Sequence, residues 1–389
     1  MEETSMSAAL ERISTRHMMT RDSIFSGLVF VPQKTIDALR EETLGKKTKT
    51  VAKPLDAAKD KEERHVPFKR KVLVFEPDAI ALCEHEAEMA RGDLKSRASA
   101  NLKLVRQFGG YRELPLFKRK LNKLMDLKDT FTNFSEVIYA LADSMLLADV
   151  SRPEAFFIPP ILMDGPPGVG KTAFVQALAD RMGLPYMKFS AGGLQTPADL
   201  TGTSSHWGNS HTGAVFNSIA ANRSASAVVL IDEADKLPME TNFSPLPALL
   251  ELLEPESARR YRDVSLGINF DASRFIIFMT SNSTKDMDKA LLSRCRTYSI
   301  SNPGAEQRLK IAETVFSEMT GKLKNGKRMT LDIDAVMALA CSDINVRTLI
   351  RAIRAGIPRA LNAGGHVVTP VVDDGMLQNV KRPPFGFIH

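Results

Sequence analysis

An eight-residue segment of the chain, GPPGVGKT, has the residue types that bind the phosphates of a nucleotide. It matches the pattern G-x-x-x-x-G-K-[ST], and it stands between an apolar stretch at 161–163 and a helix-forming stretch at 173–182. Glycines let backbone N–H groups surround phosphate oxygens, and the N-terminus of the following helix favours negative charge. The pattern therefore predicts a site for the phosphates of a nucleotide. The segment consists of Gly165, Pro166, Pro167, Gly168, Val169, Gly170, Lys171 and Thr172.

Four side chains in two segments could carry the chemistry of ATP hydrolysis. Lys171 supplies a positive charge to the phosphates, and the Thr172 hydroxyl can bind Mg²⁺. Asp232 and Glu233 end a second apolar stretch, in the segment VVLIDEADK. We expect Asp232 to hold Mg²⁺ through water and Glu233 to polarise the attacking water as a general base. An acidic pair that ends a strand is often only a solvated turn, but its position after a phosphate-binding segment favours the catalytic interpretation.

Asn282 ends a third apolar stretch, RFIIFMTSN. A polar side chain at that end of the predicted sheet would lie beside the terminal phosphate, where it can hold the attacking water. Asparagine at a strand end is also a common turn former. We favour the catalytic role because the two segments described above accompany it.

These segments belong to a pattern of alternating strands and helices. Apolar runs at 161–163, 186–189, 228–231 and 275–280 predict buried parallel strands, and the helical stretches between them are typical of an open α/β sheet. Apolar residues at helical spacing from 134 to 145 predict a helix, with Thr132 or Asn133 as its N-cap. The sequence thus predicts a nucleotide-binding α/β core.

We predict four regions along the chain. Residues 1–75 combine a possible short strand at 24–32 with a Lys-rich stretch at 45–65 that has too little apolar surface to fold, which indicates a linker. Residues 76–130 are mostly helical. Residues 131–302 form the large α/β domain, and residues 303–389 form a small all-helical domain.

The composition is that of a globular protein and excludes several classes. Hydrophobic residues make up 43% of the 389 residues and charged residues 25%, which excludes a wholly disordered or fibrous chain. The net charge of +6 is a mild excess that permits a nucleic-acid partner without arguing for one. The three cysteines are far apart, which favours a reducing, cytoplasmic environment. We expect no secretory leader and no membrane partner, because the first residues are acidic and no apolar run is long enough to span a bilayer.

The stretch from Ile161 to Arg296 resembles the ATPase module of the Lon proteases, a branch of the AAA+ ATPases. The resemblance lies in GPPGVGKT, SAGGL, IDEADK, LPALLELLEPE, YRDVSLGINFDASRFIIFMTSN and ALLSRCR. SAGGL and LPALLELLEPE are the more specific parts, since many P-loop enzymes share the phosphate-binding pattern. The resemblance implies a P-loop AAA+ core, in which a parallel sheet is flanked by helices, followed by a small helical lid domain.

The resemblance also implies roles for three further residues. Arg294 matches the arginine finger, which reaches the ATP site of a neighbouring subunit. Arg347 matches the sensor-2 arginine of the lid, although Asn345 stands where the family has a glycine. Trp207 falls where the family has an aromatic residue that grips polypeptide in the central pore, although Gly208 follows it here instead of an aliphatic residue. A surface role for Arg294 and loop packing for Trp207 are the alternatives.

The implied function is Mg²⁺-dependent ATP hydrolysis by a homo-oligomeric ring, a hexamer by family likeness, that remodels or unfolds protein substrates. Residues 348–389 are too few for the peptidase domain of Lon proteases, so we expect no protease activity and possible work with a separate effector. The alternative is a nucleic-acid-associated motor or loader. It is supported by the positive charge of the Lys-rich stretch and of Lys118, Arg119 and Lys120. That alternative is not favoured, because no nucleic-acid-reading motif is present. A slow ATP-dependent switch is a third possibility.

Overall fold

The structure is a computed structural model that describes residues 70–372, apart from 205–209, 239–242, 324–327 and 343. The predicted strand at 24–32, the predicted linker at 45–65 and Trp207 lie outside the described residues.

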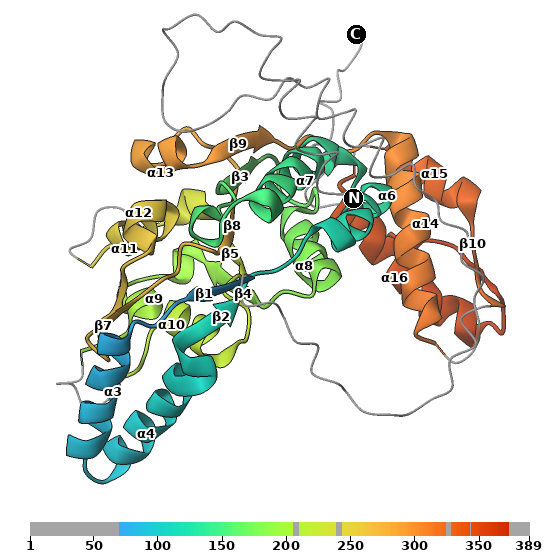
Figure 1. Ribbon diagram of the computed structural model, residues 1–389. Helices are drawn as coiled ribbons and strands as arrows, with labels where there is room; N and C mark the ends of the chain where they lie inside the picture. The colour runs from blue at the N-terminus through green and yellow to red at the C-terminus, as the bar shows by residue number, and fades with distance from the viewer. Residues whose placement is uncertain (1–69, 205–209, 239–242, 324–327, 343, 373–389) are drawn as a thin grey trace, which may run out of the picture. The chain divides into compact units, whose positions relative to one another are not determined.

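The core is a five-stranded parallel sheet in the order β4-β5-β8-β3-β9 (Figure 1). Its strands are β3 (Ile161–Asp164), β4 (Tyr186–Ser190), β5 (Val228–Asp232), β8 (Ile276–Ser281) and β9 (Arg296–Ser299). The inner strands β3, β5 and β8 are almost wholly buried because helices pack against the sheet, which explains their continuous apolar sequences. The predicted α/β core, with a parallel sheet flanked by helices, is confirmed.

Strand β9 was not expected from the sequence. Its residues are mostly exposed, and among the described strands it pairs with β3 alone, at the edge of the sheet. An edge strand needs no apolar run, so hydrophobic patterning did not reveal it.

Helix α8 (Lys171–Met182) begins within the phosphate-binding segment, at Lys171, and packs on β5 and β8. Phe174 in α8 stacks on Phe134 with ring centroids 4.7 Å apart, and it meets Phe278 of β8 edge-on at 6.4 Å. These ring contacts fix the helix that carries Lys171 and Thr172 against the sheet. The other helices of this part are α7 (Ser135–Val150), α9 (Ala198–Thr201), α10 (Ala214–Ala221), α11 (Leu246–Leu253), α12 (Pro255–Ala258) and α13 (Lys289–Arg294), and a hairpin is formed by β6 (Tyr261–Asp263) and β7 (Ile268–Phe270).

The predicted helix at 134–145 is present as α7, but its predicted cap is wrong. Phe134 occupies the N-cap position and no side chain caps the helix. The Asn133 side-chain amide instead donates to the carbonyls of Val169 (3.4 Å) and Ser301 (3.1 Å). A capping residue that has tertiary acceptors within reach can leave its helix uncapped.

Residues 70–134, the described part before α7, are largely helical, as the sequence predicts. Helices α3 (Pro77–Met89) and α4 (Asp93–Arg106) form a hairpin, and β1 (Lys71–Leu73) pairs antiparallel with β2 (Tyr111–Glu113). Figure 1 shows this hairpin in blue and cyan. The chain continues through the short helices α5 (Leu121–Met125) and α6 (Leu127–Thr130).

Arg112 of β2 is buried, with 1% of its surface exposed. Its guanidinium donates five hydrogen bonds, all to backbone carbonyls: those of Leu104, Gln107, Tyr111, Ile219 and Ala220. Burial lowers the pKa of Arg112 to about 10, so the side chain is still charged at neutral pH. It therefore ties the end of α4 to the end of α10.

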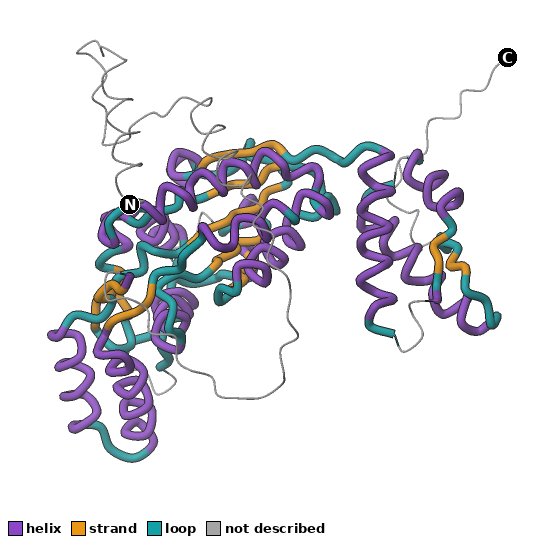
Figure 2. Tube along the Cα trace, turned by 45° about the vertical axis from the view of Figure 1, so that its right-hand side comes forward, coloured by secondary structure: helices purple, strands orange, loops and turns teal. Residues whose placement is uncertain are grey.

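Helices α14 (Ala305–Gly321), α15 (Ile333–Cys341) and α16 (Val346–Asn362) pack around an apolar core of their own (Figure 2). Two short strands, β10 (Thr330–Leu331) and β11 (Val367–Val368), pair in parallel beside them. Two-residue strands are too short to leave a periodic signal in the sequence. Every helix in the described ranges is too short or too polar to cross a bilayer.

Candidate active site

The phosphate-binding segment joins β3 to α8 at the end of the sheet that is formed by the carboxyl ends of the parallel strands. Gly168 and Gly170 have φ angles of +86° and +104°, which residues with a Cβ rarely adopt. A Cβ on Gly165 would lie 2.1 Å from the Ile300 carbonyl oxygen, so this position has no room for a side chain. Glycine is therefore required at Gly168 and Gly170 by the backbone conformation, and at Gly165 by the close approach of the Ile300 carbonyl.

Lys171 is buried at the start of α8, and its ammonium group points back to the segment. It donates to the carbonyl oxygens of Gly165 and Pro166 (3.1 Å), and its Nζ lies 3.4 Å from Oδ1 of Asn282. Burial lowers the pKa of Lys171, while the nearby carboxylates of Asp164 and Asp232 act in the opposite direction. The structure thus brings the predicted lysine and the predicted strand-end asparagine together.

Among the acidic groups at this end of the sheet, the Asp232 carboxylate makes the most polar contacts. The Thr172 Oγ1 lies 3.0 Å and 3.1 Å from its two oxygens, which joins the two predicted Mg²⁺ ligands directly. The Thr280 hydroxyl donates to Oδ1 at 2.7 Å, and the Lys188 ammonium lies 2.7 Å from Oδ2. Burial acts to raise the pKa of Asp232, but these hydrogen bonds outweigh it and leave the pKa below its ordinary value. The carboxylate is therefore ionised at neutral pH.

Glu233 has an unusual backbone conformation. Its φ of 58° and ψ of 50° lie in the left-handed region, which is uncommon for a residue other than glycine. Its N–H donates to Thr280 Oγ1 at 2.9 Å, and its carboxylate pairs with Lys236 Nζ at 2.9 Å. Strained backbone of this kind persists where the surroundings hold it, and it is often found at active sites. Thr280 is the group that holds it here, since one hydroxyl contacts both acidic residues.

The two predicted arginines lie in different surroundings. Arg347, in the first turn of α16, is close enough to Lys171 for its charge to help lower the lysine pKa. The start of α16 is also near the phosphate-binding segment, because a Cβ on Gly168 would lie 3.0 Å from Asn345 Cγ. Arg294 instead contacts Glu254 Oε2 at 3.4 Å and the carbonyl of Ala290 at 3.1 Å. Among the described residues, the polar contacts of Arg294 do not include the phosphate-binding segment.

The segment that carries Trp207 is anchored on both sides by described residues. The Thr203 N–H donates to the His211 carbonyl at 2.9 Å, and a Cβ on Gly213 would lie 2.1 Å from the Leu200 carbonyl oxygen. The Gly213 N–H donates to the buried Asp263 carboxylate at 2.8 Å. The ends of this loop are therefore held together and bonded to the β6–β7 hairpin.

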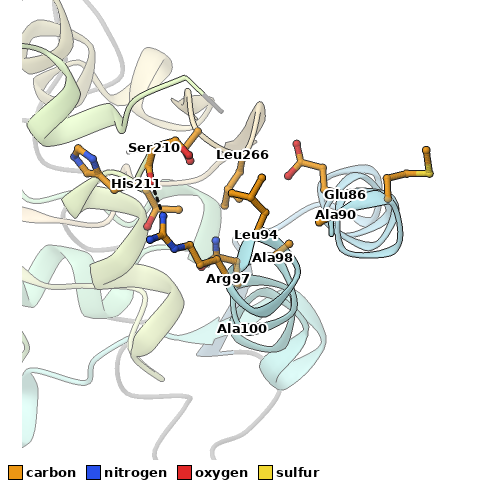
Figure 3. A pocket seen from close by; sticks show the side chains of 13 residues that line it. Glu86, Ala90, Leu94, Arg97, Ala98, Ala100, Ser210, His211 and Leu266 are labelled. Atoms are coloured by element: carbon orange, nitrogen blue, oxygen red, sulfur yellow. Dashed lines mark hydrogen bonds between the residues drawn. The ribbon is translucent and has the colours of Figure 1, made fainter. Parts of the chain in front are cut away.

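A cavity of about 750 Å³ lies beside this loop, away from the phosphate-binding segment. Figure 3 shows its walls, which come from the α3–α4 hairpin, from residues 210–212 and from the turn after β6. Leu94 and Leu266 give it apolar surface, and Glu86 and Arg97 give it charges of opposite sign. The Arg97 guanidinium reaches across to the Ser210 carbonyl at 3.4 Å.

Two residues of the site escaped prediction. Thr280 is a hydroxyl residue inside an otherwise apolar strand, and Lys188 is a charged residue inside the strand YMKFS. Both interruptions are visible in the sequence, but neither says which acidic group the side chain will meet. That depends on the strand order, which places β5 between β4 and β8.

The model of the family described as "ATPase family associated with various cellular activities (AAA)" matches residues 161–301. The Lon protease of Rickettsia typhi is 31% identical over 253 residues, which cover 62% of this chain and 32% of that protein. The mitochondrial Lon protease homolog of Ostreococcus lucimarinus is 31% identical over 242 residues, which cover 58% of this chain and 25% of that protein. The chain thus spans about a third or less of the length of these curated relatives.

Solved structures of Hsp104 share the fold. The complex of S. cerevisiae Hsp104 with casein, in its extended conformation, matches with a TM-score of 0.52 and 16% identity over 73% of this chain and 60% of that chain. A closed state of Hsp104 with ATPγS and FITC casein gives a TM-score of 0.54 and 15% identity over 74% and 60%. Residues 161–301 therefore match the AAA family of ATPases, and the chain is similar in sequence to the ATPase region of Lon proteases.

Proposed function

We propose that this chain hydrolyses ATP with Mg²⁺ and is a subunit of a ring that unfolds or remodels protein substrates, as a chaperone does. The observation that carries the proposal is the direct contact between Thr172 and Asp232, beside the buried ammonium of Lys171. In a P-loop ATPase these groups have to meet, because the same Mg²⁺ and phosphates engage all of them.

The side chains present fit Mg²⁺. A threonine hydroxyl and an ionised carboxylate are oxygen donors, which Mg²⁺ prefers. The Lys188 ammonium next to Asp232 Oδ2 is a stand-in cation, which indicates that this position favours positive charge. Thr172 and Asp232 would hold the metal, directly or through water, and bound Mg²⁺ would neutralise phosphate charge.

The remaining groups fit the roles of base and water holder. Glu233 is the proposed general base, and Thr280 fixes its backbone. Asn282 lies beside Lys171, where its amide can position the attacking water. In the structure the Glu233 carboxylate contacts Lys236, so this exposed ion pair has to open before the carboxylate takes a proton from water.

Ring assembly is proposed from the position of Arg294. The Arg294 side chain is about one-third exposed, and among the described residues its polar contacts are an ion pair with Glu254 and a hydrogen bond to the Ala290 carbonyl. An arginine finger supplied to a neighbouring subunit stabilises transition-state charge, typically by about 10³-fold to 10⁵-fold in rate. We retain a homohexamer as the proposed assembly and Arg347 as the residue that senses the terminal phosphate.

Protein is the proposed substrate class. Trp207 would supply the aromatic contact, and the loop that carries it is anchored to the β6–β7 hairpin through Gly213 and Asp263. The adjoining cavity adds apolar surface near the same loop. A nucleic-acid partner has less support, because Lys120 donates to the Met182 carbonyl of its own chain. The cytoplasmic location stays a prediction from the sequence.

The test replaces the proposed base. Glu233→Gln should keep nucleotide binding and lower ATP hydrolysis by about 10²-fold or more, since a general base contributes about 10²-fold to 10⁴-fold. Glu313→Gln, which alters an exposed carboxylate of α14, is the matched control and should hydrolyse ATP at the wild-type rate.

Both proteins are assayed alone, with an unfolded polypeptide and with DNA. Wild-type turnover by Glu233→Gln would refute the assignment of the base. Stimulation by DNA alone would refute protein as the substrate.

A further inference from the structure

Lys188 makes an ion pair with the carboxylate that is proposed to hold Mg²⁺. It lies in β4, next to β5, with its Cα opposite that of Leu230. Its ammonium lies 2.7 Å from Asp232 Oδ2, with 42% of the Lys188 side chain and 16% of the Asp232 side chain exposed. The lysine side chain therefore reaches two residues further along the neighbouring strand, from its register partner Leu230 to Asp232 at the carboxyl end.

A lysine in an edge strand has a simple explanation that does not account for this contact. Strand β4 is at the edge of the sheet, and charge on an edge strand discourages pairing with other chains. That purpose is served by an ammonium in solvent. Here the ammonium is instead held at the partly buried oxygen that a metal ion needs.

Both oxygens of the Asp232 carboxylate already have polar partners. Thr280 donates to Oδ1, Thr172 lies within hydrogen-bond distance of both oxygens, and Lys188 contacts Oδ2. A divalent ion that approaches these oxygens meets the positive charge of Lys188 at close range. Lys188 and the metal therefore compete for the same anion.

We propose that Lys188 is a positioning residue that serves as the counter-ion of Asp232 in the metal-free site and gives way when Mg²⁺ arrives with nucleotide. The inference rests on the proposed Mg²⁺-nucleotide site. Lys188 holds the carboxylate in place, and its half-exposed side chain can turn to solvent when the metal binds. It thereby sets the Mg²⁺ concentration that the site requires.

The experiment measures the Mg²⁺ dependence of binding of a fluorescent ATP analogue to the full chain, without reference to turnover. Lys188→Met should lower the half-saturating Mg²⁺ concentration by about fivefold, since a competing, partly exposed cation is removed. Lys188→Arg keeps the charge and should stay within about twofold of the wild type. Lys103→Met removes an exposed charge of α4 and should leave the Mg²⁺ dependence unchanged.

Thermal unfolding separates this role from a purely structural ion pair. Lys188→Met should lower the melting temperature without metal, and saturating Mg²⁺ and nucleotide should remove most of that difference. Equal losses with and without metal, or an unchanged or raised Mg²⁺ requirement, would overturn the proposal. A wild-type chain that binds the analogue without any need for Mg²⁺ would refute the proposed metal site itself. Lys188→Gln provides the same comparison if the methionine variant does not fold.

Discussion

Thr280 offers a sharp test of how the site is held. It is buried, with 1% of its surface exposed, and its one hydroxyl donates to Asp232 Oδ1 at 2.7 Å and accepts from the Glu233 N–H at 2.9 Å. Thr280→Val keeps the shape of the side chain and removes both hydrogen bonds. The change therefore releases the carboxylate of one acidic residue and the backbone of the next.

The expected cost follows from these two contacts. A hydrogen bond to a charged group contributes about 1.5–3 kcal/mol, and an unpaired N–H costs about 1–3 kcal/mol when it is buried. The Glu233 N–H is only partly buried and valine suits a strand, so we expect a net loss of about 3 kcal/mol in the free energy of unfolding. Glu233 should also leave its left-handed backbone conformation, which costs about 1–3 kcal/mol to maintain.

The measurements are denaturant unfolding and steady-state ATP hydrolysis, with Thr280→Ser as the control that keeps the hydroxyl. Thr280→Val should lose about 10²-fold in hydrolysis rate, because a general base that is out of position contributes little. Nucleotide binding should change much less, since Lys171 and the glycines are untouched. If the valine variant matches the serine variant in both rate and stability, the hydroxyl does not hold the site and the reasoning fails.

Two further predictions concern buried groups outside the site. Arg112→Met should lower the free energy of unfolding by at least about 3 kcal/mol, because it removes the buried side chain that donates to the Leu104 carbonyl of α4 and the Ala220 carbonyl of α10; a loss below about 0.5 kcal/mol in a denaturant titration would contradict this role. Burial raises the pKa of Cys83 and of Cys295 to about 12, so at pH 8 both remain thiols, the unreactive form. Mass spectrometry after brief alkylation should therefore find the label on the exposed Cys341, and rapid modification of Cys83 in the folded protein would disprove its burial.

The sequence was most informative where a single segment carries both the fold and the chemistry. The phosphate-binding segment needs glycines, a lysine and a hydroxyl in fixed order, so its placement between a strand and a helix could be predicted before any tertiary contact was known. The inner strands were equally predictable, because burial on both faces makes their sequences continuously apolar.

Contacts between distant segments could not be predicted in the same way. Strand β9 is polar because it lies at an edge, and Asn133 bonds Val169 and Ser301 instead of capping α7. The contacts of Thr280 and Lys188 with Asp232 depend on the order of the strands, which places β5 between β4 and β8. The roles given to Glu233, Asn282, Arg294, Arg347 and Trp207, and the domain boundaries, stay predictions.

The close approach of Gly165 to Ile300 has a mechanical consequence. The Ile300 carbonyl packs where a side chain of Gly165 would be, and the Asn133 amide bonds the Val169 carbonyl on one side and the Ser301 carbonyl on the other. These contacts hold the phosphate-binding segment against residues 300–301, which follow β9. Helix α14 begins at Ala305. Any rotation of the α14–α16 group that accompanies a change of nucleotide must therefore use the backbone torsions of residues 302–304 as its hinge.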